Sequence, residues 1–399
     1  MKHLKILVLS IFCISLLSGA SELLAKDKFT LNAPLPITGK SKKFGEMVKN
    51  ATEIALSEIN AKGGFKKGIL KGQEFEINFI DTGSDKAKAV EIVERLIAED
   101  KQPVIFGTYG SGNGFAMAEV AAKHGTPCFI NMGSADKITQ QGWQNVFRIM
   151  PASVQYLTGL RGFLNTVVKP KTMAILYEPT SYGKSASGNM KKICEADGIK
   201  IVYEEAYEGK ATDFKPMLLK VKQTNPDVIF MVSYLMDATL LMKQSKELKI
   251  NPKIFAGGAA GFVLPDFPKN AGAAAEGVVT SSLWVPGVKY PGARKFAEDY
   301  VTKYETNPSY HATLAYATTY VLQDILQRTG TLGYGDIIAA SKKTDITTPF
   351  GRIQFGNFDV YTNQNKAYTI AMQVQDGELV TVWPKKVAEK KYRYPVQKW

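Results

Sequence analysis

The fold follows from residues 103–136, PVIFGTYGSGNGFAMAEVAAKHGTPCFINMGSAD, which contain one complete strand–loop–helix–strand unit. The apolar run 103–106 predicts a strand, a small-residue helix begins near Phe115, and the run 126–130 predicts the next strand. In a parallel sheet, the loops that follow both strands leave at the same edge. Open α/β sheets bind their ligands at that edge.

Ser111 and Ser134 lie in these two loops, and their surroundings favour a small anion. A helix N-terminus carries unpaired backbone N–H groups and about half a positive charge, and a nearby serine adds a neutral donor. A carboxylate fits such a site. The alternative is that Ser111 and Gly112 only cap the helix and form a turn. This unit alone leaves both interpretations open.

The same alternation continues on either side and predicts two α/β series. The first has strands at 29–35 and 75–81, a helix from Phe44 to the Gly63-Gly64 pair, and a helix at 85–100. Alternating strands and helices are typical of a doubly wound parallel sheet. The second series alternates helices at 153–168, 184–196, 214–223 and 235–248 with strands at 172–177, 199–205, 227–232 and 253–256. The expected fold class is α/β, with two doubly wound lobes.

The last third of the chain returns to the same kinds of element. A strand is predicted at 277–284 and helices at 291–304 and 309–329, followed by β-hairpin segments with a tight-turn signal at Asp376-Gly377. A return to strands after two complete α/β series indicates that the chain crosses between the lobes more than once. No low-complexity linker separates them, so we expect a short, multi-crossing hinge.

Composition and the first residues indicate export. The chain has 399 residues, of which 45% are apolar and 22% charged, as in soluble globular proteins. Residues 1–25 have a basic start, an apolar centre and small residues near the end, which is typical of a secretory signal peptide. No later stretch reaches the roughly 20 apolar residues that a membrane-spanning helix needs. We expect a protein that is free in the periplasm.

The formal net charge of +13 does not indicate nucleic-acid binding. The lysines are scattered, and the one dense basic segment, 385–398, is accompanied by no recognised nucleic-acid-binding module. A solvated surface explains the charge better, and such a surface helps to attract an anionic ligand.

Residue types that usually carry catalysis or bind metals are scarce after residue 25. The histidines His124 and His311 and the cysteines Cys128 and Cys194 form no cluster with metal-ligand spacing. No nucleophile-elbow, phosphate-loop or dinucleotide-binding motif is complete. We therefore expect no enzyme activity, no metal and no cofactor. The cysteines are expected to be two buried thiols, with one disulfide as the alternative.

A series of short motifs then points to a family. They are Phe44-Gly45, EINAKGG at 58–64, Phe106-Gly107 with Ser111, TQQG at 139–142 with Phe147-Arg148, SYG at 181–183, Asp213-Phe214 with NPD at 225–227, and GAAG at 258–261. Each motif is weak, but their order and spacing are specific. From Lys28 to its end, the chain resembles the periplasmic substrate-binding proteins of ABC transporters of the leucine/isoleucine/valine-binding type.

The resemblance implies a type I periplasmic binding protein, a Venus-flytrap clamp that closes on its ligand and docks on a membrane permease. Closure requires the ligand to contact both lobes and so to bind the closed state better. We expect a monomer with lobe 1 formed by residues 28–149 and 285–350, and lobe 2 by residues 150–284 and 351–399.

The resemblance also implies a set of ligand-binding residues. Ser111 matches the serine that hydrogen-bonds the ligand's carboxylate, and Ser134 matches a Ser/Thr that holds its polar head. Tyr182 matches the second-lobe aromatic residue that closes on the ligand. The other expected contacts are the Met132 backbone carbonyl, Gly133, the wall residues Phe44 and Tyr109, Tyr234 in a second-lobe loop, and Trp284 near a crossing.

One position departs from the family pattern. Amino-acid binders of this type have a carboxylate in the loop at 258–262 that pairs with the ligand's ammonium, and Ala260 stands there in this chain. A desolvated ammonium without a counter-charge costs at least a few kcal/mol. The expected ligand is therefore a small carboxylate with an apolar or aromatic body. Asp136 or Asp237 replacing the missing charge would keep amino acids as the first alternative. A ligand-sensing clamp for a receptor and an exported enzyme are the others.

Overall fold

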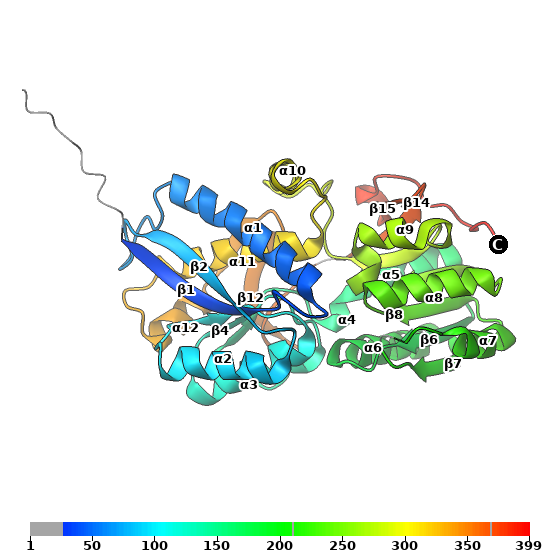
Figure 1. Cartoon of the computed structure of the whole chain (residues 1–399), viewed down its shortest axis with the longest axis horizontal. Helices are drawn as coiled ribbons and strands as arrows, with labels where there is room; N and C mark the ends of the chain where they lie inside the picture. Colours follow the sequence, from blue (N-terminus) through cyan, green and yellow to red (C-terminus); the bar gives the residue numbers. More distant parts are fainter. Residues whose placement is uncertain (1–26, 210, 368) are drawn as a thin grey trace, which may run out of the picture.

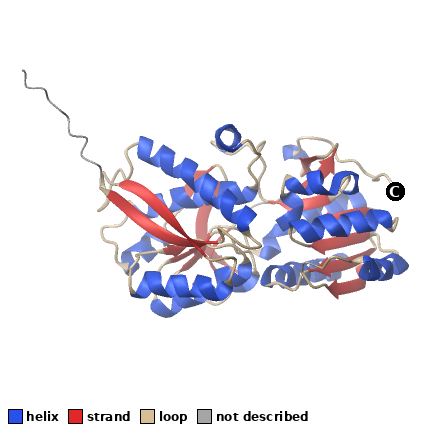
Figure 2. Cartoon of the chain, in the orientation of Figure 1, coloured by secondary structure: helices blue, strands red, loops and turns tan. Residues whose placement is uncertain are grey.

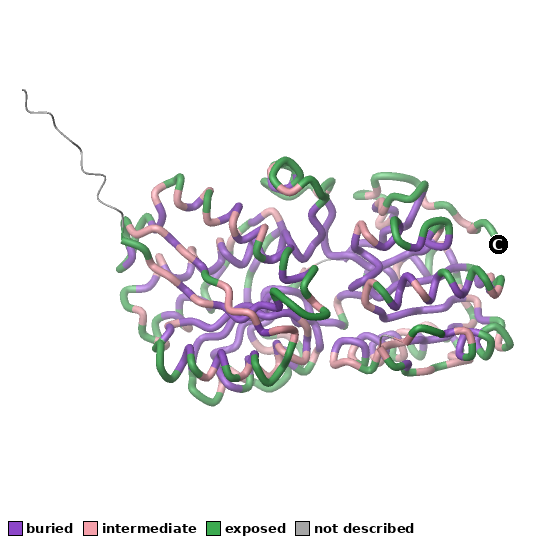
Figure 3. Tube along the Cα trace, in the orientation of Figure 1, coloured by how far each residue is buried: buried purple, intermediate pink, exposed green. Residues whose placement is uncertain are grey.

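The computed structural model describes residues 27–399 except 210 and 368, so the predicted signal peptide lies outside the described residues. Two lobes lie side by side, each with strands inside and helices outside (Figures 1 and 2). Buried backbone is concentrated in the strands, and exposed backbone in the outer turns of the helices (Figure 3). This arrangement confirms the predicted pair of doubly wound lobes.

The first lobe is built from two stretches of chain. Its elements are β1 (Lys28–Leu35), α1 (Lys42–Ala61), β2 (Glu74–Asp81), α2 (Lys86–Ala98), β3 (Ile105–Phe106), α3 (Ser111–His124), β4 (Cys128–Ile130), η1 (Asp136–Ile138) and β5 (Val146–Arg148), then α10 (Ala293–Tyr304), α11 (Tyr310–Leu326), α12 (Tyr334–Lys342), β11 (Asp345–Thr348), β12 (Gly351–Phe358) and β13 (Tyr361–Asn365). One sheet has the order β11-β12-β13-β5-β4-β3, and β1 pairs with β2.

A glutamine side chain joins these two groups of strands. Gln102 accepts a hydrogen bond from the Asn32 backbone N–H at 2.7 Å and donates from its Nε2 to the carbonyls of Asn32 and Val104. It thus pairs with β1 much as another strand would. Further along, the Thr108 backbone N–H donates to the carbonyl of Pro34. The result is the strand succession β2-β1-β3-β4-β5 of a doubly wound sheet.

The second lobe repeats that succession. Its elements are α5 (Thr158–Phe163), η2 (Leu164–Val168), β6 (Thr172–Tyr177), α6 (Ser181–Asp197), β7 (Lys200–Ala206), α7 (Lys215–Thr224), β8 (Val228–Val232), α8 (Leu235–Glu247), β9 (Ile254–Gly257), η3 (Ala260–Val263), α9 (Asp266–Ala271), η4 (Gly272–Ala274), β10 (Val279–Ser282), β14 (Ile370–Gln375), β15 (Glu378–Trp383) and η5 (Lys385–Val387). The sheet order is β15-β14-β10-β9-β8-β6-β7. The short helix α4 (Ser153–Tyr156) lies at the first crossing between the lobes (Figure 1).

Residues 351–365 were predicted in lobe 2, but in the structure they belong to lobe 1. β12 pairs with β11, and β13 pairs with both β12 and β5, so these strands extend the first-lobe sheet. The last crossing therefore falls between Asn365 and Ile370. The cause is visible in β13, whose polar side chains bond the backbone just after β5: Gln364 Nε2 donates to the Met150 carbonyl and Asn365 Nδ2 to the Ile149 carbonyl.

Helices cover both faces of each sheet. In the first lobe, α1, α10 and α11 pack on one face and α2 and α3 on the other. In the second lobe, Met173 and Ile175 of β6 face α5 and α6, whereas Ala174 and Leu176 face α7, α8 and α9. Alternate residues of one strand thus serve opposite cores, as strand geometry requires. No helix in the described part of the chain is both long and apolar enough to cross a membrane.

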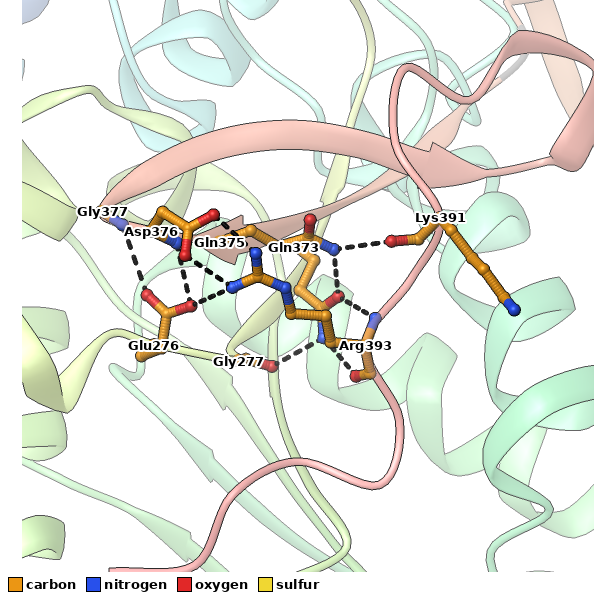
Figure 4. Close-up of polar contacts among 8 residues, drawn as sticks. All are labelled: Glu276, Gly277, Gln373, Gln375, Asp376, Gly377, Lys391 and Arg393. Atoms are coloured by element: carbon orange, nitrogen blue, oxygen red, sulfur yellow. Dashed lines mark hydrogen bonds and ion pairs between the residues drawn. The ribbon is translucent and has the colours of Figure 1, made fainter.

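The C-terminal segment 385–399 packs against the second lobe. Gln373 of β14 donates to the Arg393 carbonyl at 2.9 Å and accepts from the Arg393 backbone N–H at 2.8 Å, so one amide side chain holds the segment like a strand partner (Figure 4). The Arg393 guanidinium also pairs with Asp376 and Glu276. At the end, the Trp399 ring stacks on Phe255.

Both described cysteines are buried free thiols, as predicted. Cys128 lies in β4 and Cys194 in α6. Burial raises the pKa of the Cys194 thiol to about 11, so this group is protonated at neutral pH.

Candidate ligand-binding site

A narrow cavity lies where the carboxyl-end loops of the two sheets meet. It holds about 330 Å³ of space between atoms, part of which is open to solvent. Its walls come from both lobes, as ligand sites at the carboxyl ends of parallel strands do. The lining residues are Tyr109, Gly110, Ser111, Met132, Ser134, Met150, Tyr156, Tyr182, Tyr234, Ala260, Tyr310 and His311.

Two neighbouring serines form part of the cavity wall. Ser111 Oγ accepts hydrogen bonds from the backbone N–H groups of Ser134 at 3.1 Å and Ala135 at 3.0 Å. Because both of these groups donate, the Ser111 hydroxyl proton remains available for another acceptor. No described residue bonds Ser134 Oγ, so its hydroxyl is also available. The two loops therefore lie together, as predicted, and offer two neutral donors.

Gly133 leaves room for two isoleucine side chains beside this loop. A Cβ on Gly133 would lie 3.0 Å from Ile138 Cδ1 and 3.2 Å from Ile130 Cγ2. Gly133 is absent from the cavity wall, so the structure gives it a spacing role and not the predicted ligand contact. The Met132 carbonyl, which was expected to face the ligand, accepts from the Gly110 N–H at 2.8 Å, although the Met132 side chain does line the cavity.

A buried arginine supports the loop that contains Ser134 from behind. The guanidinium of Arg148 donates to the Ala135 carbonyl at 2.7 Å, to Thr139 Oγ1 at 2.8 Å, and to the side chain of Gln364. Burial lowers the pKa of Arg148 to about 10, so the group stays positively charged at neutral pH. The charge of Asp136 opposes this shift in the pKa of Arg148, but no ion pair joins the two side chains among the described residues. A positive charge therefore lies close behind the serines.

Helix N-termini add to this positive potential. The helices α3, α6, α8 and α11 begin at residues 111, 181, 235 and 310, at or next to lining residues. The first N–H groups of a helix have no partner within it and attract anions. None of the described lining residues is Asp, Glu, Lys or Arg. The wall therefore favours a negative ligand group and contains no carboxylate for a positive one.

Tyrosines form much of the rest of the cavity wall. The Tyr156 hydroxyl donates to the Tyr310 hydroxyl at 3.5 Å, and the Ala260 backbone faces the same Tyr310 oxygen. Burial raises the pKa of Tyr182 well above its ordinary value and that of Tyr234 to about 12. These phenols are therefore neutral hydrogen-bonding groups at physiological pH.

His311 lines the cavity as a neutral ring. Burial lowers its pKa to about 3, and its Nδ1 lies 3.2 Å from Ser309 Oγ, the N-cap residue of α11. The ring stacks on Tyr310, with centroids 4.0 Å apart, and contacts Phe44 at 4.8 Å. Without a charge, His311 contributes packing and shape to the site.

The structure brings seven predicted residues to the cavity, namely Ser111, Ser134, Met132, Tyr109, Tyr182, Tyr234 and Ala260. Phe44 lies one layer behind, stacked on Tyr109 with centroids 4.1 Å apart. Trp284 is buried elsewhere, where its Nε1 donates to the Pro349 carbonyl and its ring meets Phe296. Asp237, in the first turn of α8, is absent from the lining as well.

Asp136 lies at the boundary between the lobes but outside the cavity wall. Its carboxylate accepts from Ser185 Oγ and Asn189 Nδ2 of α6 in the second lobe, and from the Val154 backbone N–H of α4. These bonds cross from one lobe to the other. Asp136 therefore joins the lobes, which is not the ligand contact predicted for it.

Sequence reasoning missed Gly110, Met150, Tyr156, Tyr310 and His311. Met150 and Tyr156 belong to the first crossing, which no strand–loop–helix pattern marks. Tyr310 and His311 start α11, and the Ser309 N-cap before them was a usable signal of a helix N-terminus.

Comparison with known proteins places this architecture in a family. The family model described as periplasmic binding protein matches residues 33–378. The chain is a periplasmic binding protein. This finding confirms the resemblance drawn from the motifs.

Individual relatives of this periplasmic binding protein agree. It is 29% identical to Leu/Ile/Val-binding protein homolog 7 of Brucella suis biovar 1, over 96% of this chain and 97% of the relative. Its structure resembles that of the leucine binding protein LivK from Thermotoga maritima MSB8, with a TM-score of 0.79, 22% identity, and 88% and 97% of the two chains covered. It also resembles an ABC-transporter solute binding protein from R. palustris in complex with 4-hydroxybenzoate, with a TM-score of 0.76, 20% identity, and 89% and 95% covered.

In the described part of the chain, no group of three or more His, Cys, Asp and Glu residues is arranged to hold a metal ion. By their names, the Brucella relative and LivK are Leu/Ile/Val- or leucine-binding proteins, and the R. palustris neighbour is a solute binding protein of an ABC transporter.

Proposed function

We propose that this chain is the periplasmic solute-binding component of an ABC uptake transporter and that it binds a small organic acid between its lobes. The predicted leader at 1–25 would direct export, and the closed monomer would dock on a membrane permease. The protein would bind and release its ligand without changing it.

The observation that carries this proposal is the charge of the cavity wall. The wall contains neutral hydroxyl donors and helix N-termini, Arg148 lies behind it, and none of its described residues carries a negative charge. These features favour a carboxylate. An ammonium buried there would have no counter-charge, which costs several kcal/mol.

A second candidate is a branched-chain amino acid, because the Brucella relatives are named Leu/Ile/Val-binding protein homologs and LivK is a leucine binding protein. In this chain, neither Asp136 nor Asp237 lines the cavity to neutralise an ammonium. We therefore rank organic acids first. The neighbour with bound 4-hydroxybenzoate shares the fold and supports an aromatic acid as a ligand to test.

A thermal-shift panel followed by calorimetric titration tests the proposal. The panel compares benzoate, 3- and 4-hydroxybenzoate and phenylacetate with L-leucine, L-isoleucine and L-valine. A true ligand at 100 times its dissociation constant adds about 2.7 kcal/mol of stability. We expect stabilisation by carboxylates that lack an ammonium, and recovery of the bound compound unchanged. Stabilisation by the amino acids alone would refute the organic-acid proposal, and turnover of the compound would refute the binding role.

A further inference from the structure

One tyrosine hydroxyl at the cavity has no internal partner. Tyr182 lines the cavity with 8% of its surface exposed, and its hydroxyl lacks a hydrogen-bond partner among the described residues. Buried polar groups in native proteins are nearly always paired, so such a group calls for an explanation. Its position on the ligand-facing wall supplies one, because a ligand atom can be its partner.

The position of Tyr182 is fixed by its helix. It is the second residue of α6, and the N-cap residue Thr180 accepts from the Gly183 backbone N–H at 3.1 Å. Its ring packs edge-on against Tyr156, with centroids 6.4 Å apart. A Cβ on Gly183 would lie 1.9 Å from the Glu178 carbonyl, so the turn before α6 admits only glycine there. The hydroxyl is thus held in place before any ligand binds.

A second tyrosine hydroxyl of the wall, that of Tyr310, can also bond a ligand. The Tyr310 oxygen accepts from Tyr156 and faces the Ala260 backbone, which leaves the Tyr310 proton free to donate. Ala260 itself presents only a methyl group. The wall around Tyr182, Tyr310 and Ala260 therefore offers neutral hydroxyls and no charged partner for an ammonium.

We propose that Tyr182 recognises an uncharged oxygen substituent, a hydroxyl or a carbonyl, on the ligand's body, separate from its carboxylate. The ligand class is then a small oxygen-substituted organic acid, such as a hydroxylated aromatic acid, and Tyr182 is the residue that selects it over the unsubstituted acid. A site built to hydrogen-bond a hydroxyl disfavours an analogue that lacks one, because its own buried group is then left unpaired. This inference rests on the proposed function of the same cavity.

The test measures calorimetric affinities of the whole chain after residue 25 for benzoate, 4-methylbenzoate, and 3- and 4-hydroxybenzoate. We expect the better hydroxybenzoate to bind at least about tenfold more tightly than 4-methylbenzoate, which has a similar size but no hydrogen-bonding group. Tyr182→Phe should reduce this preference to within about twofold, because the variant has no hydroxyl to pair with the ligand's oxygen.

Tyr207→Phe is the matched control. Its hydroxyl donates to Ser233 Oγ, and the residue is buried in the second lobe and is not among the residues that line the cavity. This variant should keep the full preference. Equal affinity of the unaltered protein for the hydroxylated and methylated acids overturns the inference but leaves the proposed function standing, as does a Tyr182→Phe protein that keeps the preference. Failure of every carboxylate to bind overturns both. The comparison of acids on the unaltered protein stays decisive even if a variant fails to fold.

Discussion

Ser111 and Ser134 should respond differently to loss of their hydroxyls, although both line the same part of the cavity wall. Ser134 Oγ has no partner among the described residues, so Ser134→Ala removes only a donor to the ligand. Ser111 Oγ accepts from two buried backbone N–H groups at 3.1 and 3.0 Å, so Ser111→Ala removes that donor and also leaves both N–H groups unpaired.

The magnitudes follow from these contacts. A hydrogen bond to a charged group contributes about 1.5–3 kcal/mol, so either variant should bind a carboxylate roughly 10- to 150-fold more weakly. Each buried N–H left without a partner costs about 1–3 kcal/mol. The free energy of unfolding of the unliganded Ser111→Ala protein should therefore fall by about 2–6 kcal/mol, whereas that of Ser134→Ala should stay within about 0.5 kcal/mol of the original.

Urea unfolding without ligand and calorimetric titration with the best carboxylate of the panel measure the two quantities separately. Equal unfolding free energies for the two variants would refute the assignment of Ser111 Oγ as a structural acceptor. Unchanged affinity in both variants would refute the placement of the carboxylate at the serines.

The remaining predictions concern a titrating group, a contact between lobes and a buried charge. The pKa of His311 is about 3 in the folded protein and 6.5 when unfolded, so the unfolded state binds the extra proton between these values and stability falls as pH falls below 6.5. Between pH 7 and 5 the free energy of unfolding should fall by about 2 kcal/mol, and urea unfolding should show that this pH-dependent fall is missing in His311→Phe. An equal fall in the variant would contradict the assignment of the titrating group to His311. Asp136→Ala removes the acceptor of Ser185 and Asn189 across the lobe boundary, and small-angle scattering should show a more open ligand-bound form; identical profiles would argue against a closing role. Arg148→Gln should lower the unfolding free energy by at least about 3 kcal/mol, because charged hydrogen bonds to Ala135 and Thr139 are lost. A change under about 1 kcal/mol would show that this segment keeps its conformation without the arginine.

The α/β frame could be predicted because it follows from local periodicity. α1 buries Phe44, Val48 and Ile59 at helical spacing, and α3 ends at Gly125, whose φ of 67° forms a left-handed cap. The start of α3 was predicted too late, near Phe115. Its first turn contains glycines, which local propensity disfavours, but contact with the β4 loop stabilises it as a helix.

The lobe to which residues 351–365 belong could not be predicted from local sequence patterns. β13 reads YTNQN, with no apolar alternation to mark a strand, because Asn363, Gln364 and Asn365 bond to loops and to β5 of the first lobe. Such a strand is specified by long-range polar contacts. A local pattern therefore could not show which sheet it joins.

About half of the residues that line the cavity could likewise be predicted from the sequence. Loops after predicted strands supplied Ser111, Ser134 and Tyr234. Tyr156 comes from the crossing and Tyr310 from a helix more than 150 residues further along the chain, so only the folded arrangement brings them together.

The C-terminal segment decides which lobe an attached label would follow. Trp399 stacks on Phe255 and Arg393 pairs with Asp376, so a dye coupled at the chain's end would travel with the second lobe. Since Cys128 and Cys194 are buried, a cysteine introduced at an exposed first-lobe position would react selectively with a second dye. Energy transfer between the two dyes would then report the opening and closing of single molecules, because the C-terminal segment holds the first dye against the second lobe.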